Sequence, residues 1–130
     1  MRYWVIVATA MCLACPAAAS AQAVISGGEF ARRAEPWLKK SWLSLVTAKE
    51  PKRLMQQFAD SGERVRRAQD ADRAAGRKPA SCIPPKGKAK IDLRQFVGSI
   101  RTMPAADQAR PLDHALVQWS RKAYPCPAGA

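Results

Sequence analysis

Histidine and other metal-binding side chains are scarce in this chain, which limits the chemistry that it can perform. Its one histidine is His114. Adjacent residues of a helix point in different directions, so the neighbouring Asp113 cannot orient it as a catalytic base. We therefore expect His114 to be an exposed helix residue without a catalytic role. The sequence also lacks a glycine-rich phosphate loop and a cluster of residues at metal-ligand spacing. It thus predicts no enzyme, no cofactor and no metal site.

Long hydrophobic runs are absent after the first residues. The chain begins with Arg2, an apolar run over residues 3–13, and small residues beyond Pro16, which is the pattern of a secretory signal peptide. The run is too short for a permanent membrane helix. No later stretch approaches the roughly 20 apolar residues that a bilayer span needs.

Two sites fit cleavage of this signal, after Ala21 and after Ala23, and the first fits better. Acylation of Cys15 is disfavoured by the residues on both sides of it. We predict a signal peptide over residues 1–21, export to the periplasm, and one helical domain over residues 22–130.

Cysteine is also rare. Removal of the signal takes away Cys12 and Cys15, leaving Cys82 and Cys126 in an oxidising compartment. We expect an intramolecular disulfide between them; the alternatives are two free thiols or an intermolecular bridge. A bridge closing about 45 residues is worth on the order of 4 kcal/mol in the chain-entropy model.

Acidic residues are outnumbered, with 10 Asp and Glu against 22 Lys and Arg and a formal net charge of +12. Such a balance favours acidic partners, namely nucleic acid, anionic lipid, cell-wall polyanions or an acidic protein. The charge is spread along the chain without a basic tail. We expect the densest clusters, "ERVRR" at 63–67 and "KGKAK" at 86–90, to be solvated surface.

The clearest helix signals lie in the second half of the chain. Asp92 is placed as an N-cap, and Gln95 can complete a capping box with it, while Ile91 can pack on Phe96. Four apolar residues then follow with helical spacing, namely Leu93, Phe96, Val97 and Ile100. Pro104 marks the end of the helix. One helix of about ten to twelve residues is predicted here.

A second helix is predicted after Pro111, which suits a first helical turn. Its apolar positions are Leu112, Ala115, Leu116, Trp119 and Ala123. It should end before Pro125, because a residue that precedes proline avoids the helical region. The short loop at 104–110 predicts an antiparallel helix pair, with the disulfide tying the start of the first helix to the end of the second.

The first half predicts helices less sharply. Pro36 can open a helix that ends at residues 49–51 and has four apolar positions: Leu38, Trp42, Leu45 and Val46. A further helix should run from Lys52 to about Ala75, with a bend or break at Ser61-Gly62. "SGG" at 26–28 is expected in a mobile N-terminal segment.

No segment alternates with the two-residue period of a strand, and no Asn-Gly or Asp-Gly hairpin signal occurs. The predicted fold class is all-α, a small bundle of about four helices with a C-terminal antiparallel pair clamped by one disulfide. We expect Trp42, Phe58, Phe96 and Trp119 in the core, Trp37 and Phe30 exposed, and Tyr124 packed beside the disulfide.

From Cys82 onward the sequence resembles a known family. "SCIPPKG", a helix, a proline, a second helix and "AYPCP" are similar to the C-terminal pattern of Rap/Tai-type immunity proteins, over residues 80–127. Members of this family are small, exported, helical proteins that protect bacteria from peptidoglycan amidase effectors delivered by type VI secretion. The only residues that match a family motif are Cys82 and Cys126, and the resemblance gives them a structural role.

The resemblance implies a periplasmic inhibitor that covers the substrate cleft of a secreted amidase, with a homodimer as a further implication. It leaves the partner-binding residues unknown. The alternative hypothesis is a basic envelope protein that binds polyanions, such as lipopolysaccharide, cell-wall polymer or DNA.

Overall fold

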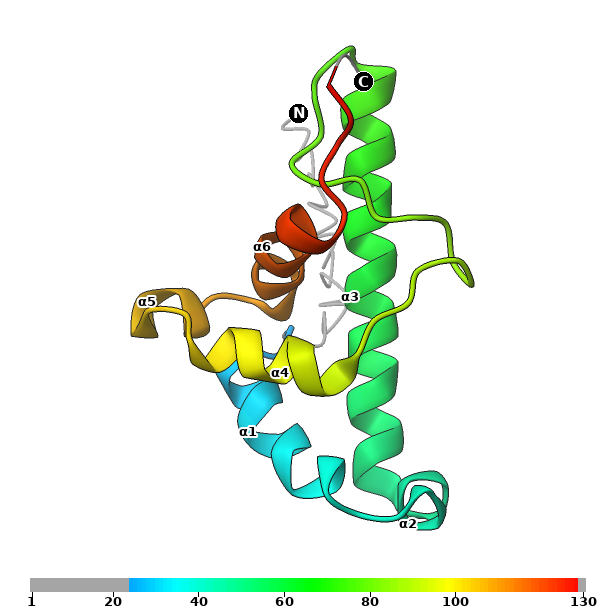
Figure 1. The fold of residues 1–130 in the computed structure, drawn as a ribbon, viewed down its shortest axis with the longest axis vertical. Coiled ribbons are helices and arrows are strands. Elements are labelled where there is room, and N and C mark those ends of the chain that lie inside the picture. Colours follow the sequence, from blue (N-terminus) through cyan, green and yellow to red (C-terminus); the bar gives the residue numbers. More distant parts are fainter. Residues whose placement is uncertain (1–23, 129–130) are drawn as a thin grey trace, which may run out of the picture.

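The computed structural model describes residues 24–128, and the secondary structure there is helical (Figure 1). The helices follow in the order α1 (Gly27–Leu38), α2 (Trp42–Thr47), α3 (Lys49–Ala74), α4 (Leu93–Arg101), α5 (Ala105–Gln108) and α6 (Leu112–Ala123). Four are long and two are short, so the predicted all-α bundle is confirmed. The predicted signal peptide lies outside the described residues. None of these helices is both long enough and apolar enough to cross a bilayer.

Helix α3 is the longest element, with 26 residues, and α1, α4 and α6 all lie on one side of it (Figure 1). Helix α6 packs most extensively against α3, and α4 packs most extensively against α1. Helices α4 and α6 also contact each other. The C-terminal pair therefore shares its core with the N-terminal helices.

Helix α3 runs without interruption through Ser61 and Gly62, where the sequence predicted a bend or break. Both residues are buried because α6 crosses α3 at this point. The Ser61 hydroxyl donates to Asp113 Oδ1 at 2.5 Å, and a Cβ at Gly62 would lie 3.9 Å from a Leu116 methyl group. Both residues have low helix propensity, but they lie in the contact between α3 and α6, and this tertiary packing keeps α3 continuous.

The start of α3 also differs from the prediction, which placed a helix end at residues 49–51. These residues form the first turn of α3, and Pro51 is buried there. Because the first amide groups of a helix have no partner within it, a proline is tolerated at this position. The proline that indicated a stop therefore belongs to a helix start.

The expectation of a mobile segment at residues 26–28 is wrong. The Ser26 hydroxyl caps α1 by accepting a first-turn backbone N–H at 3.1 Å. The Gly27 N–H donates to the Arg110 carbonyl at 3.0 Å, and a Cβ at Gly27 would lie only 3.1 Å from the Ala115 Cβ. Contacts with the distant connection between α5 and α6 therefore fix the start of α1.

The core centres on the ring of Phe96 in α4, which is fully buried. Its centroid lies 6.1 Å from that of Phe30 in α1, 5.2 Å from Phe58 in α3 and 6.0 Å from Trp119 in α6. Phe58 and Trp119 are half-buried and pack against the core, as predicted. One ring therefore joins the four long helices.

The burial of two aromatic residues, Phe30 and Trp42, was predicted wrongly. Phe30, expected at the surface, is fully buried because α1 starts before Pro36, which lies inside the helix. Trp42, expected in the core, is 71% exposed because the chain turns between α1 and the short α2. The single predicted helix that would have carried Trp42 inward does not form.

Helices α4 and α6 lie where the sequence predicted them. The Asp92 side chain caps α4 by accepting the backbone N–H groups of Arg94 and Gln95 at 2.8 and 3.3 Å. Helix α6 follows Pro111 and ends before Pro125. The connection between them, predicted as a loop, contains the short helix α5.

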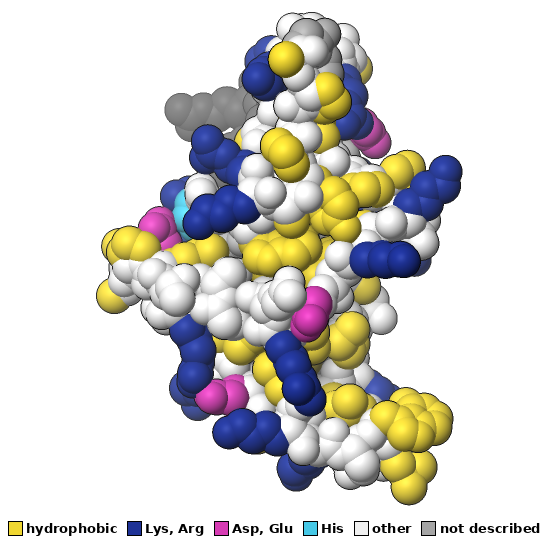
Figure 2. All heavy atoms as spheres, viewed as in Figure 1, with side chains coloured by type: hydrophobic (Ala, Val, Ile, Leu, Met, Phe, Trp, Pro, Cys, Tyr) yellow, Lys and Arg dark blue, Asp and Glu magenta, His cyan; other side chains and the backbone are white. Residues whose placement is uncertain are grey.

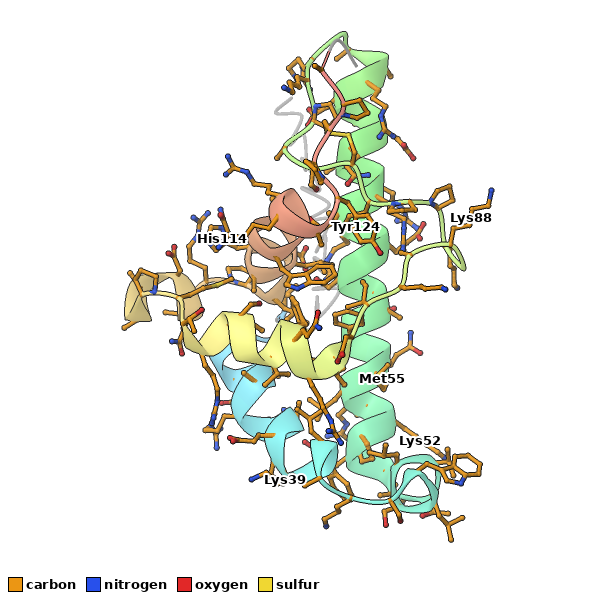
Figure 3. All side chains as sticks on the ribbon, in the orientation of Figure 1. Lys39, Lys52, Met55, Lys88, His114 and Tyr124 are labelled. Carbon is orange, nitrogen blue, oxygen red and sulfur yellow. A yellow bond between two sulfur atoms is a disulfide. The ribbon has the colours of Figure 1, made fainter. Side chains whose placement is uncertain are left out.

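The C-terminal joint, which we define as Cys82, Lys90, Tyr124 and Cys126, ties the end of the chain to the segment before α4. The predicted disulfide joins Cys82 to Cys126, with their Cα atoms 5.0 Å apart. The Cys82 N–H donates to the Tyr124 carbonyl at 3.1 Å. The Tyr124 hydroxyl donates to the Lys90 carbonyl at 2.9 Å and accepts the Lys90 N–H at 3.0 Å; Figure 3 labels Tyr124. The tyrosine thus adds noncovalent contacts to the bridge.

Candidate functional site

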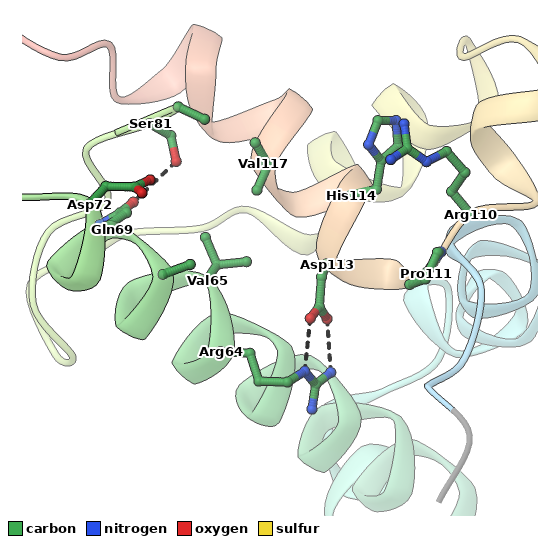
Figure 4. A pocket seen from close by; sticks show the side chains of 12 residues that line it. Arg64, Val65, Gln69, Asp72, Ser81, Arg110, Pro111, Asp113, His114 and Val117 are labelled. Atoms are coloured by element: carbon green, nitrogen blue, oxygen red, sulfur yellow. Dashed lines mark hydrogen bonds and ion pairs between the residues drawn. The ribbon is translucent and has the colours of Figure 1, made fainter. Parts of the chain in front are cut away.

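A cavity of about 420 Å³ opens between α3, α6 and the segment around Ser81 (Figure 4). Its wall collects polar side chains that are distant in sequence, with Arg64 and Gln69 from α3 and Asp113 and His114 from α6. We take this α3–α6 cavity as the candidate site. What it can do depends on whether those side chains have free polar groups.

Asp113 is fully engaged within the protein. Its carboxylate accepts two hydrogen bonds from the Arg64 guanidinium, from Nε to Oδ2 and from Nη2 to Oδ1, both at 2.8 Å (Figure 4). The Ser61 hydroxyl donates a third at 2.5 Å. Partial burial alone would raise the pKa of Asp113, but the hydrogen bonds from Arg64 and Ser61 and the Arg64 charge outweigh it and hold the pKa below its ordinary value. An ionised, paired carboxylate is a poor proton acceptor, so Asp113 fastens α6 to α3.

We expect Asp113→Asn to lower the free energy of unfolding at pH 7 by about 1 kcal/mol. Hydrogen bonds to charged groups contribute about 1.5–3 kcal/mol, and solvent screening at these partly exposed side chains reduces that figure. Because the pKa of Asp113 is depressed in the folded state, the contribution is complete above the ordinary aspartate pKa of about 3.9 and is lost as the pH falls below it. Urea unfolding at pH 7, 5 and 3 measures this.

The exposed, short-range pair of Asp70 with Arg73 gives a matched control. Asp70→Asn should change stability by less than about 0.5 kcal/mol at each pH. A stability gap between wild type and Asp113→Asn that stays the same from pH 7 to pH 3 would contradict the assignment.

His114 points away from Asp113, as predicted from the helix geometry. Its Nε2 lies 3.1 Å from Asp107 Oδ1 of α5, and its side chain is only 14% exposed. The expectation of an exposed histidine is therefore wrong, because α5 covers it. The contact holds α5 against α6.

Gln69 is buried in the wall of the cavity and binds the segment that leads to the disulfide. Its Oε1 accepts the Ser81 hydroxyl at 3.1 Å and the Ile83 N–H at 2.9 Å, and its amide nitrogen donates to the Ile83 carbonyl at 3.4 Å. Within residues 24–128 no three His, Cys, Asp or Glu side chains are grouped so that they could hold a metal ion. The polar groups of the α3–α6 cavity thus mainly join structural elements.

Ion pairing divides the cations of the described chain into two kinds. The cations that pair with a carboxylate are seven arginines: Arg32, Arg33, Arg64, Arg67, Arg73, Arg77 and Arg101. None of the lysines between residues 24 and 128 forms such a pair. The acidic residues therefore pair with arginines, and the excess positive charge lies on the lysines and on the arginines that have no carboxylate partner. Figure 2 shows Lys and Arg side chains over much of the visible face.

The two basic clusters noted in the sequence meet across a groove of about 470 Å³. Arg66 and Arg67 of α3 line it together with Lys86. Arg66 Nε donates to the Pro84 carbonyl at 3.1 Å, and Arg67 pairs with Glu63 at 3.5 Å. Sequence reasoning missed this meeting because the clusters lie on separate elements. Of these three cations, Lys86 forms neither a hydrogen bond nor an ion pair with the described residues.

Comparison with protein-family models, with curated proteins and with solved structures finds no match to the chain. The fold is that of a small all-helical protein in which a disulfide joins the C-terminal segment to the segment before α4.

Proposed function

We propose that the protein is a periplasmic inhibitor of a secreted peptidoglycan amidase, similar to the Rap/Tai-type immunity proteins. The observation that carries the proposal is the C-terminal joint. Cys82 and Cys126 stand in the "SCIPPKG" and "AYPCP" segments that resemble the family pattern, and they are bonded across α4 and α6. Export through a signal peptide over residues 1–21 and oxidation of this bridge belong to the same proposal.

Inhibition by surface contact is the mechanism that fits the candidate site. The inward-facing polar side chains, such as Asp113 and Gln69, are engaged with other parts of the chain. The protein would therefore act without catalysis, by covering the amidase cleft with a rigid helical surface in which a few anchors dominate the affinity. Its positive charge predicts an acidic amidase surface and an association rate that falls with salt.

Capture experiments test the partner. The immobilised, oxidised protein is exposed to secreted peptidoglycan amidases, above all any that is encoded next to it, in about 150 mM salt. We expect one amidase to be retained and others to pass through. If no amidase is retained, and the exported protein does not protect cells from amidase-driven lysis, the proposal fails.

A polyanion-binding envelope protein is the second candidate, and the unpaired lysines favour it. Binding to lipopolysaccharide, cell-wall polymer or DNA would weaken smoothly between about 50 and 200 mM salt as counterions are released, with little discrimination among the polymers. A specific inhibitor should instead discriminate sharply among proteins. Salt titrations with both kinds of ligand separate the two candidates.

A further inference from the structure

The short helix α2 presents apolar side chains to solvent at one end of the molecule. Trp42 is 71% exposed, Leu43 60% and Val46 41%. Helix α2 lies beside the beginning of α3, at the lower right in Figure 1. Hydrophobic side chains gather at the same place in Figure 2. We call Trp42, Leu43 and Val46 the α2 tip. None of these three side chains belongs to the buried core.

Cations flank the α2 tip on both sides in the chain. Two lie in the turn before α2 and three in the first two turns of α3, and all are exposed: Lys39, Lys40, Lys49, Lys52 and Arg53. None of the five forms an ion pair within the described residues. The carboxylate among them, Glu50, accepts a hydrogen bond from Arg33 Nε at 2.7 Å. The positive charge around the tip is therefore uncompensated.

We propose that the α2 tip docks the protein onto an anionic phospholipid surface. Tryptophan and aliphatic side chains favour the boundary between lipid head groups and acyl chains. Lysine and arginine beside them attract phosphate groups and keep their charged ends in water. The tip combines both features within one short stretch, with Lys39 before it and Lys52 after it in the sequence; Figure 3 labels both.

Other occupants fit the tip less well. A second copy of the chain placed symmetrically on it would bring two sets of five unpaired cations together, and like charges repel. A specific protein partner usually covers about 800 Å² on each side, whereas the tip is a projecting group of three apolar side chains. A bilayer needs only a few inserted side chains and surrounding positive charge.

Docking in this way would leave the rest of the molecule free. Helix α3 starts beside the tip and, at about 1.5 Å per residue, extends about 39 Å away from it. The C-terminal joint lies towards the far end of α3, where Cys126 Sγ is 3.7 Å from the carbonyl of Pro79. The proposal goes beyond amidase inhibition, since membrane docking and amidase binding would use separate ends and can be tested separately.

Vesicle cosedimentation tests the proposal. The purified protein is mixed at low salt with vesicles of phosphatidylcholine alone, or with about 30% phosphatidylglycerol added. We expect binding to the anionic vesicles only. The variant Trp42→Ser with Leu43→Ser and the variant Lys49→Gln with Lys52→Gln should each reduce partitioning by about tenfold or more. All four residues are exposed, and an unchanged thermal midpoint verifies that the variants fold.

A matched control removes the same charge elsewhere. Lys86→Gln with Lys88→Gln, in the exposed loop before α4, should reduce partitioning by less than about threefold. The proposal is overturned if anionic vesicles do not bind, if the control pair matters as much as the tip lysines, or if the Trp42 and Leu43 changes have no effect. Sedimentation equilibrium adds one more outcome: a dimer that becomes monomeric on changing Trp42 and Leu43 would assign the tip to a second copy.

Discussion

Phe96→Ala should destabilise the protein by about 4 kcal/mol, the typical cost of removing a large aromatic side chain from a packed core. The Phe96 ring is fully buried and lies within about 6 Å, centroid to centroid, of aromatic rings from the other three long helices. Its removal would leave a cavity where all four helices meet and would abolish three aromatic contacts. Because small domains have only about 5–15 kcal/mol of total stability, the variant should be close to unfolding at 37 °C.

Urea unfolding measures this effect as a lower midpoint at an unchanged slope. Trp42→Ala is the matched control, since it also removes a large aromatic ring but from an exposed position; it should cost less than about 0.5 kcal/mol. Equal losses from the two substitutions would contradict the described packing of α1, α3, α4 and α6.

Cys82→Ser should lower stability by about 4 kcal/mol under oxidising conditions, and Cys126→Ser should do the same. The bridge closes a loop with a sequence separation of 44 residues, and in the chain-entropy model most of its effect comes from restricting the unfolded chain. At about 4–8 °C per kcal/mol, the thermal midpoint should fall by more than about 15 °C.

Reductant supplies the control for this prediction. The reduced wild type should unfold near the temperature of the Cys82→Ser variant, and the variant itself should not respond to reductant. A wild-type midpoint that is the same with and without reductant would show that no intramolecular bridge stabilises the protein.

The parts of the fold that could be predicted are those with local signals. Helix α4 was predicted because Asp92 can cap it using its own side chain and the next few amide groups. The bounds of α6 followed from Pro111 and Pro125, whose backbone restrictions act on neighbouring residues. The disulfide was predicted by counting, because the expected removal of a signal peptide leaves two cysteines, and these allow one intramolecular pairing.

The errors arose where distant contacts decide. The start of α1 depends on contacts of Gly27 with Arg110 and Ala115. These residues lie more than 80 positions away in the sequence, so the residues around Gly27 do not indicate the contacts. Phe30 was misplaced for the same reason. Ser61 and Gly62 lower helix propensity locally, yet they lie within α3, where they are buried and Ser61 is hydrogen-bonded to Asp113 of α6.

The sequence did not predict the contacts of the candidate site. Arg64 and Asp113 are 49 residues apart, so only the folded chain shows that their charges cancel. The exposure of Trp42 likewise follows from the turn before α2, while its helical spacing to Leu38 indicated burial. Residue types alone do not show which of the many basic side chains are paired and which face solvent.

Titration of a peptidoglycan amidase with this protein tests the account most directly. The oxidised protein is added in increasing amounts to the amidase that the capture experiment is expected to retain, and release of cleaved peptidoglycan is followed. We predict that hydrolysis falls in proportion to the added protein and stops near a fixed molar ratio, as expected for a tight inhibitor that covers the cleft. Undiminished hydrolysis at a large molar excess would contradict the proposed function.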